Sequence, residues 1–157
     1  MKELGIGIIG FGTVGAGVAD CLIKNGEVIA KRTGVKPVIR KIADLDIVRD
    51  RGVKVPQEVL TTDAMEAIET CEVIVELVGG TTFAKTIILE ALKRGKPVVT
   101  ANKALLAKYG EELFAEAEKS GADIFYEASV GGGIPIIKSL REGLVGMVDL
   151  DAYDYTP

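Results

Sequence analysis

The sequence predicts an α/β fold in three layers, α/β/α, with helices on both faces of a doubly wound parallel sheet. Short apolar runs, typical of buried strands, alternate along the chain with longer amphipathic segments. A glycine-rich turn, Gly10-Phe-Gly-Thr-Val-Gly15, joins the first apolar run to the first helical pattern, as in Rossmann-type folds. The chain has 157 residues, 48% of them hydrophobic, which is enough for one domain with its own core.

In the first third of the chain, we expect a strand over residues 4–10 and a helix over residues 13–24. The apolar residues on one face of this helix are Val14, Val18, Cys21 and Leu22. Asn25-Gly26 is expected to end it as a left-handed cap, with residues 27–32 as a short helical extension before Gly34.

The second strand is expected over residues 37–43, and the charged segment 44–55 that follows is rich in turn residues. Asp63 and Glu66 resemble the capping pair of a short helix that ends near Ile68. Further strands are expected over residues 73–78, 97–100 and 123–127, and further helices over residues 82–94, 104–119 and 134–141. From Leu144 onward, loosely alternating valines and acidic residues indicate a strand that leaves the domain.

Each glycine of the first turn has a separate physical task in a dinucleotide site. Gly10 lets the strand turn tightly, Gly12 lets a pyrophosphate approach the backbone, and Gly15 lets the helix pack close to the strand. The helix that follows points free N–H groups and about half a positive charge at the phosphates. This turn, between a strand and a helix, predicts a nucleotide site.

The ribose of the nucleotide should lie at the end of the second strand, where acidic residues favour NAD and arginines favour NADP. Asp44 and Asp46 are the acidic candidates there. The basic candidates are Arg40 and Lys41 on the strand and Arg49 and Arg51 in the loop. The sequence leaves both cofactors open.

Two later segments also follow strands, so they should lie at the same edge of the sheet. Lys103 is placed to contact an anionic substrate or cofactor near the nicotinamide, and Asn102 is placed to cap the helix that begins there. Glu127 precedes three glycines, Gly131 to Gly133, whose carbonyls with the carboxylate would suit a hard cation. The alternative is a tight loop that needs positive φ angles.

Composition argues against several functions. The net charge is −4 and no basic run is present, so a nucleic-acid partner is not expected, and no apolar run has the length that crosses a membrane. The chain has no histidine, which removes the commonest general base and zinc ligand. Cys21, expected in the core, and Cys71 have no metal-ligand spacing, and the N-terminus lacks the shape of a secretory leader. We therefore expect a cytoplasmic protein.

Taken together, these segments resemble homoserine dehydrogenases. The matching motifs are GFGTVGAG at residues 10–17, ELVGGTT at 76–82, TANKALL at 100–106 and YEASVGGGIPII at 126–137. Many dehydrogenases share the first motif, whereas the last two are specific in this order and spacing. The resemblance covers about residues 4–146.

The resemblance implies hydride transfer between homoserine or aspartate 4-semialdehyde and NAD or NADP, in threonine and methionine biosynthesis. It implies that Phe11, Thr13 and Val14 line the cofactor pyrophosphate, that Gly79 and Gly80 pass under the nicotinamide half, and that Lys103 lies near the reacting centre as a catalytic and cofactor-binding residue. The family's sodium site maps onto Glu127 and the backbone of Val130, Gly132 and Ile134.

Residues 1–146 are therefore expected to form an NAD(P)-binding domain, whereas residues 147–157 do not match the family. They form a divergent tail where the family's substrate domain begins, so this chain is expected to be incomplete for catalysis. A homodimer is possible, although the family's subunits pair largely through that absent part.

Two other hypotheses remain. One is a stand-alone dinucleotide-binding sensor or regulatory module. The other is a related amino-acid-pathway enzyme such as an aspartate dehydrogenase or a semialdehyde dehydrogenase. A semialdehyde dehydrogenase needs a nucleophilic cysteine, and neither Cys21 nor Cys71 is well placed for that.

Overall fold

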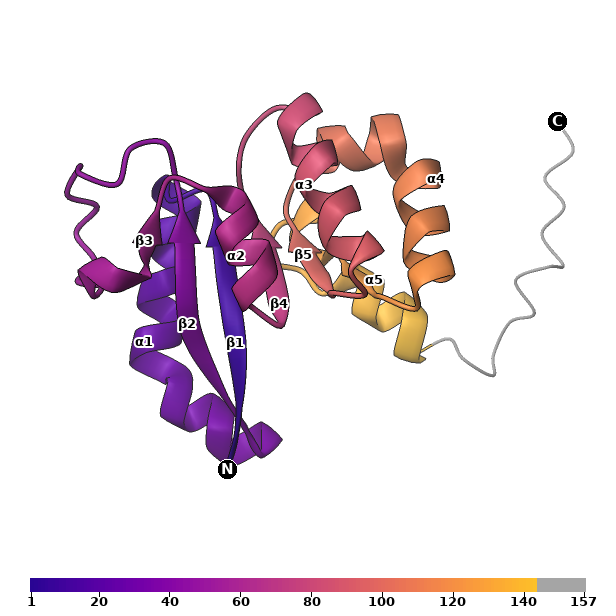
Figure 1. Cartoon of the computed structure of the whole chain (residues 1–157). Coiled ribbons are helices and arrows are strands. Elements are labelled where there is room, and N and C mark those ends of the chain that lie inside the picture. The colour runs from indigo at the N-terminus through magenta and orange to yellow at the C-terminus, as the bar shows by residue number, and fades with distance from the viewer. Residues whose placement is uncertain (144–157) are drawn as a thin grey trace, which may run out of the picture.

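In the computed structural model, which describes residues 1–143, the chain forms a parallel sheet in the order β3-β2-β1-β4-β5-β6 (Figure 1). The strands are β1 (Lys2–Ile9), β2 (Val35–Ala43), β3 (Leu60–Thr61), β4 (Val73–Glu76), β5 (Val98–Thr100) and β6 (Ile124–Phe125). The longer helices are α1 (Thr13–Thr33), α2 (Ala64–Thr70), α3 (Thr82–Lys93) and α4 (Lys103–Ser120). The strand order reverses direction at β1, as in a doubly wound Rossmann-type sheet, so the predicted fold class is confirmed.

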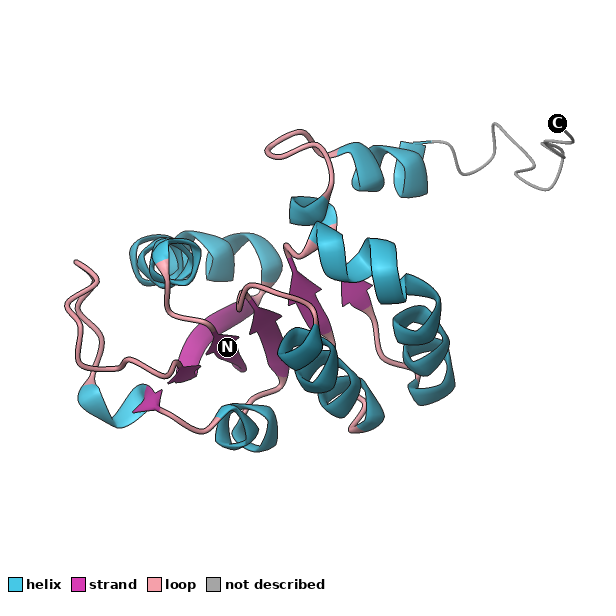
Figure 2. Ribbon diagram, turned by 90° about the horizontal axis from the view of Figure 1, so that it is seen from above, coloured by secondary structure: helices cyan, strands magenta, loops and turns pink. Residues whose placement is uncertain are grey.

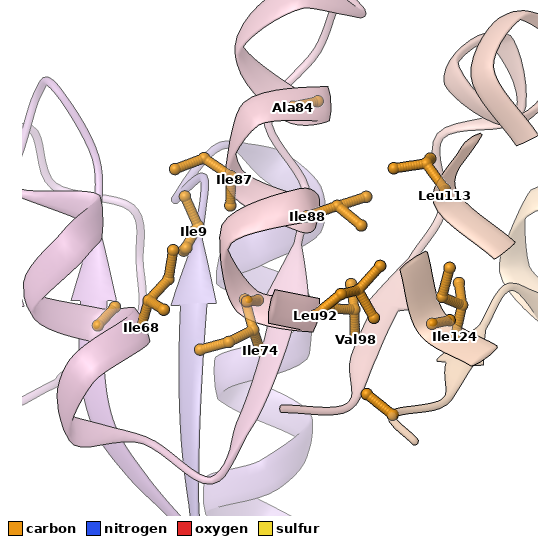
Figure 3. Packing of buried hydrophobic residues seen from close by; sticks show 14 of the residues in the cluster. Ile9, Ile68, Ile74, Ala84, Ile87, Ile88, Leu92, Val98, Leu113 and Ile124 are labelled. Atoms are coloured by element: carbon orange, nitrogen blue, oxygen red, sulfur yellow. The ribbon is translucent and has the colours of Figure 1, made fainter. Parts of the chain in front are cut away.

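Helices cover both faces of the sheet, which gives the molecule two apolar layers (Figure 2). On one face, Ile8 of β1 and Ile42 of β2 pack with Ala19 of α1. On the other face, Ile9 and Ile74 pack beneath α2 and α3 (Figure 3). Adjacent residues of one strand face opposite layers, so a strand buried on both faces is apolar at nearly every position.

Helix α1 runs further than predicted, because Asn25-Gly26 does not end it. Gly26 is buried inside the helix, and the left-handed cap is Gly34, whose φ is 77° and whose N–H donates to the Ala30 carbonyl. The predicted extension over residues 27–32 is part of the same helix.

The prediction of the packed face of α1 was only half right. Val18 and Leu22 do pack against the sheet, but Val14 and Cys21 are exposed. The buried residues of the helix are Gly15, Ala16, Ala19, Gly26 and Ala30. Small residues therefore make the close contact with the sheet, and an apolar pattern that weights large side chains misses them.

Other elements differ from the prediction mainly in length. Asp63 caps α2 as predicted, accepting a hydrogen bond from the Met65 N–H, whereas Glu66 pairs with Lys41 of β2 instead of completing a capping box. The two-residue strand β3 was not predicted, because it is too short to show a period. The helix predicted over residues 134–141 is one turn, α5 (Ile136–Lys138), continued by a π-type turn, η3 (Ser139–Gly143). The strand predicted from Leu144 and the tail 147–157 lie outside the described residues.

The loops that matter for function all leave the same edge of the sheet, because the strands are parallel. In Figure 1, β1 and β2 point toward this edge. Among residues 1–143, no helix combines the length and the apolar character that crossing a membrane requires.

Candidate functional site

The glycine turn between β1 and α1 takes the geometry that its sequence predicts. Gly10 has a φ of 101°, and a Cβ at this position would lie 2.7 Å from the Leu77 carbonyl group. A Cβ on Gly15 would lie 1.9 Å from the Gly10 carbonyl oxygen, so the helix can approach the strand only with glycine there. Nothing lies within 4 Å of a Cβ built on Gly12, which leaves its backbone open to a ligand.

The N-terminus of α1 is arranged to bind an anion. Gly12 is its N-cap residue and no side chain caps the helix. The first helical hydrogen bond runs from the Ala16 N–H to the Gly12 carbonyl oxygen, so the N–H groups before Ala16 have no partner within the helix. Thr13 and Val14 are exposed beside them, whereas the Phe11 side chain is buried in the core. Of the three residues predicted to line the pyrophosphate, Phe11 therefore does not offer its side chain.

Asp44, at the end of β2, ties the glycine turn to the following loop. One carboxylate oxygen accepts the Phe11 N–H at 2.6 Å, and the other accepts the Asp46 N–H at 2.9 Å. The Gly10 N–H also donates to the Ala43 carbonyl at 2.8 Å. A guanidinium nitrogen of Arg51 lies 3.6 Å from the Asp44 carboxylate and offsets part of its charge.

The structure separates the basic residues that were candidates for the ribose site. Arg40 lies before the end of β2, at an irregularity in its pairing with β1, and its side chain reaches over Gly5 to Glu3. Arg40 is therefore not brought together with the glycine turn. Arg49 and Arg51 instead line a cavity of about 470 Å³ that also includes Gly12 and Thr13. Sequence spacing alone could not distinguish these arginines.

A second cavity, of about 460 Å³, lies at the ends of β1, β2 and β4. Its lining is mostly apolar and consists of Ile9, Ala43, Asp44, Leu45, Thr62, Ala64, Val78, Gly79 and Phe83. The side chains of Leu45 and Phe83 are exposed here. A cavity lined by large apolar side chains is suited to an aromatic base.

A third cavity, of about 320 Å³, lies between the loops that follow β4 and β5. Its lining consists of Val14, residues 76–79 and residues 101–104. Lys103 is the first residue of α4 and is exposed, so its ammonium group is available at this cavity. Gly80 is exposed in the same loop as Gly79, with a φ of 80°. The predicted residues Gly79, in the loop after β4, and Lys103, at the start of α4, thus line one cavity.

Glu76 is a residue of this site to which the sequence motifs assigned no role. It ends β4, is 0% exposed, and lines the cavity that contains Lys103. Burial raises the pKa of its carboxyl group, while hydrogen bonds from Thr100 and the Val78 N–H lower it in part. A single glutamate at the end of an apolar strand was the signal that could have identified it.

The segment around Glu127 is folded back on itself after β6. The two carboxylate oxygens of Glu127 accept the N–H groups of Ile137 and Lys138 at 2.9 and 2.8 Å. Gly131 and Gly132 have φ angles of 73° and 61°, so the tight turn needs glycine at both positions. Among residues 1–143, no group of three or more His, Cys, Asp or Glu side chains is placed to hold a metal ion.

Comparison with known proteins points to one family. The family model described as "Homoserine dehydrogenase, NAD binding domain" matches residues 10–127. A homoserine dehydrogenase from Bacillus subtilis is 42% identical over 146 residues, which is 92% of this chain and 34% of the relative. One from Neisseria gonorrhoeae is 46% identical over 146 residues, covering 92% of this chain and 33% of the relative. The chain therefore spans about a third of the length of these curated relatives.

Solved structures agree with the sequence relatives. A homoserine dehydrogenase from Thiobacillus denitrificans superposes with a TM-score of 0.86 at 40% identity, over 93% of this chain and 34% of that one. A hyperthermophilic archaeal homoserine dehydrogenase in complex with NADPH has a TM-score of 0.69 at 31% identity, over 92% of this chain and 50% of that one. By its sequence and its fold, the chain belongs to the NAD-binding domain family of homoserine dehydrogenases.

Proposed function

We propose that this chain binds NAD(P) as the cofactor-binding part of a homoserine dehydrogenase, which interconverts homoserine and aspartate 4-semialdehyde. The observation that carries the proposal is the glycine turn, with an open backbone at Gly12 in front of an uncapped helix N-terminus. The archaeal structural relative that was solved with NADPH supports the same cofactor class.

The three cavities suggest how the cofactor would lie along the sheet edge. The pyrophosphate would accept hydrogen bonds from the N–H groups that begin α1. The adenine would lie in the apolar cavity between Leu45 and Phe83, and the nicotinamide in the cavity that contains Lys103. In this order Asp44 would lie beside the ribose, and Arg49 and Arg51 would be the nearby positive charges.

When bound, the cofactor exchanges a hydride with the carbon that carries the substrate hydroxyl or aldehyde group. The proposed role of Lys103 is to donate hydrogen bonds to oxygen atoms of the substrate, since an ammonium group carries three donors. The exposed start of α4 holds that group beside the nicotinamide cavity rather than in the core. The other side chains that this hydride transfer requires would come from the part of the enzyme that this chain does not span.

Calorimetric titration of the chain with NADPH, NADH and ADP tests the proposal. We expect both dinucleotides to bind more tightly than ADP, because only they reach the nicotinamide cavity. Gly12→Asp should abolish binding, since it places a carboxylate where the pyrophosphate would approach. Gly12→Ala should weaken binding less. Equal affinity for ADP and the dinucleotides would favour a nucleotide sensor, and no binding at all would overturn the proposal.

We also propose a monovalent cation, such as sodium, at the turn after β6. The donors would be the Glu127 carboxylate and the backbone oxygens of Val130, Gly132 and Ile134, an oxygen-only set that suits a hard cation. Each Glu127 oxygen accepts one N–H group and keeps a further lone pair. A bound cation would supply a fixed positive charge that holds this turn. Thermal unfolding should then occur at higher temperature in sodium chloride than in choline chloride, and Glu127→Gln should remove that difference.

Cytoplasmic location and pairing into a homodimer are further proposals. Both cysteines are free within the described residues, as expected in a reducing compartment. Fractionation of cells would test the location, and light scattering of the purified chain would test the dimer. A secreted protein would contradict the proposed location, and a monomeric chain would contradict the proposed dimer.

A further inference from the structure

We propose that Glu76, Thr100 and Asn102 are positioning residues that hold the two loops around the nicotinamide cavity at a fixed spacing and so set where Lys103 lies. The inference rests on the proposed function, because it assumes that the nicotinamide half of the cofactor enters this cavity. It gives a role to the buried carboxyl group of Glu76, which lies outside both the glycine turn and the apolar cavity proposed for the adenine (the adenosine cavity).

The carboxylate of Glu76 connects the ends of two neighbouring strands. One oxygen accepts the Val78 N–H at 2.9 Å, in the loop that follows β4. The other accepts the Thr100 hydroxyl at 2.7 Å, at the end of β5. The Thr100 hydroxyl oxygen in turn accepts the Asn102 N–H at 3.1 Å. Glu76 therefore links the two loops that form the walls of the cavity.

Asn102 closes these contacts into a ring. Its amide nitrogen donates to the Gly80 carbonyl at 2.7 Å, which returns the chain of hydrogen bonds to the loop that contains Val78. Its amide oxygen accepts the Leu105 N–H at 3.1 Å and caps α4. Lys103 directly follows Asn102, so the residue that ties the two loops also sets the start of the helix that carries Lys103.

A buried carboxyl group such as that of Glu76 is unusual in a protein core, and the ring of hydrogen bonds accounts for it. Glu76 and Thr100 are both 0% exposed, and the neighbouring positions of β4 are apolar. A buried carboxyl group costs free energy that an apolar side chain of similar volume would not. Its hydrogen bonds offset that cost only if both loops stay where they are, so the ring favours one spacing of the cavity walls.

The ring borders the nicotinamide cavity much more than the adenosine cavity. Glu76, Asn102 and Lys103 line the first, and none of them lines the second. The two cavities share Val78 and Gly79. Weakening the ring should therefore reduce affinity for the nicotinamide half of the cofactor and leave binding of the adenosine half nearly unchanged.

Thr100→Val and Thr100→Ser form the matched pair that tests this inference. Valine keeps the shape of threonine but removes the hydroxyl, whereas serine keeps the hydroxyl. For each variant, the dissociation constant is measured with NADPH and with 2′-phospho-ADP-ribose, which lacks nicotinamide, and in parallel with NADH and ADP-ribose. We expect Thr100→Val to weaken dinucleotide binding roughly ten-fold and binding of the shorter ligands less than about two-fold. Thr100→Ser should restore the wild-type affinities.

A second variant covers the case in which Thr100→Val does not fold. Asn102→Ser keeps a capping hydroxyl for α4 but is too short to reach Gly80, so it should produce the same split between the two kinds of ligand. Ile74→Val, in the core of β4, is the control for lost stability alone and should change neither affinity. Circular dichroism confirms that each variant is folded at the temperature of the titrations.

The outcomes separate this inference from the proposed function. If the wild-type chain binds none of the ligands, the proposed function fails. If the wild-type chain binds them but Thr100→Val and Asn102→Ser weaken both kinds of ligand equally, or neither, the ring is only a structural feature and the inference is overturned.

Discussion

The backbone N–H of Phe11 donates a hydrogen bond of 2.6 Å to the carboxylate of Asp44, and this contact joins the glycine turn after β1 to the end of β2. The same carboxylate accepts the N–H of Asp46. Asp44 therefore holds the glycine turn in place against the loop that follows β2.

Asp44→Ala should destabilise the chain by about 1–3 kcal/mol, because the Phe11 N–H in this partly buried turn would lose its acceptor. Dinucleotide affinity should fall as well, since the turn would no longer be held against β2. Urea unfolding and calorimetric titration measure the two effects. Asp50→Ala is the control for stability alone, because among the described residues its side chain accepts only the exposed Gly52 N–H. Similar losses in both variants would argue against a special role for Asp44.

The arginines near the site allow a test of cofactor preference. Arg49 lines the cavity beside Gly12 and Thr13, whereas Arg40 reaches toward Glu3. If Arg49 binds the 2′-phosphate of NADP, Arg49→Ala should weaken NADPH binding roughly ten-fold and leave NADH binding nearly unchanged. Arg40→Ala should change neither. A loss of NADPH affinity in Arg40→Ala, with none in Arg49→Ala, would return the role to Arg40.

The sequence predicted best what depends on local geometry. The turn at Gly10, Gly12 and Gly15 was identifiable from its glycine spacing, because Gly15 must pass close to the Gly10 carbonyl and Gly12 must leave its backbone open. The exposure of Cys21 was missed because small residues, not the apolar stripe, face the sheet.

The sequence pattern did not predict contacts between segments that are far apart along the chain. Arg40 and Arg49 are both basic residues that the sequence offered for the ribose, but Arg40 lies at an irregularity in the pairing of β1 with β2 and its side chain reaches Glu3. The partner of Glu76 is Thr100, 24 residues further along the chain. Such a pairing depends on which strands become neighbours, so it appears only when the sheet order is known.

Two glycines of α1 should respond in opposite ways to alanine. In Gly15→Ala, the new Cβ would lie 1.9 Å from the Gly10 carbonyl oxygen, so the turn must shift, and we expect a loss of about 1–3 kcal/mol. In Gly17→Ala, nothing lies within 4 Å of the new Cβ, and the exposed helix should gain about 0.5–1 kcal/mol. Denaturant unfolding measures both. A gain of stability in Gly15→Ala would contradict the close approach of α1 to β1.

The buried carboxyl group of Glu76 should make stability depend on pH. Burial raises the pKa of Glu76 above its ordinary value of 4.5, so the folded chain holds this proton to higher pH than the unfolded chain does. The stabilisation from this proton is complete below pH 4.5 and is lost as the pH rises through the higher pKa of the folded state. The free energy of unfolding of the wild type, minus that of Glu76→Gln, should therefore decrease as the pH rises from 4.5.

Glu66 provides the control with the opposite sign. Its hydrogen bond to Lys41, with the two charged groups 2.5 Å apart, lowers the pKa of Glu66 below 4.5. The stabilisation from this pair is present above pH 4.5 and is lost as the pH falls through the lower pKa of the folded state. The corresponding difference between the wild type and Glu66→Gln should therefore decrease as the pH falls. Because Glu66 is at the surface, added salt should weaken its effect more than that of Glu76. Two curves that run parallel with pH would show that burial does not raise the pKa of Glu76.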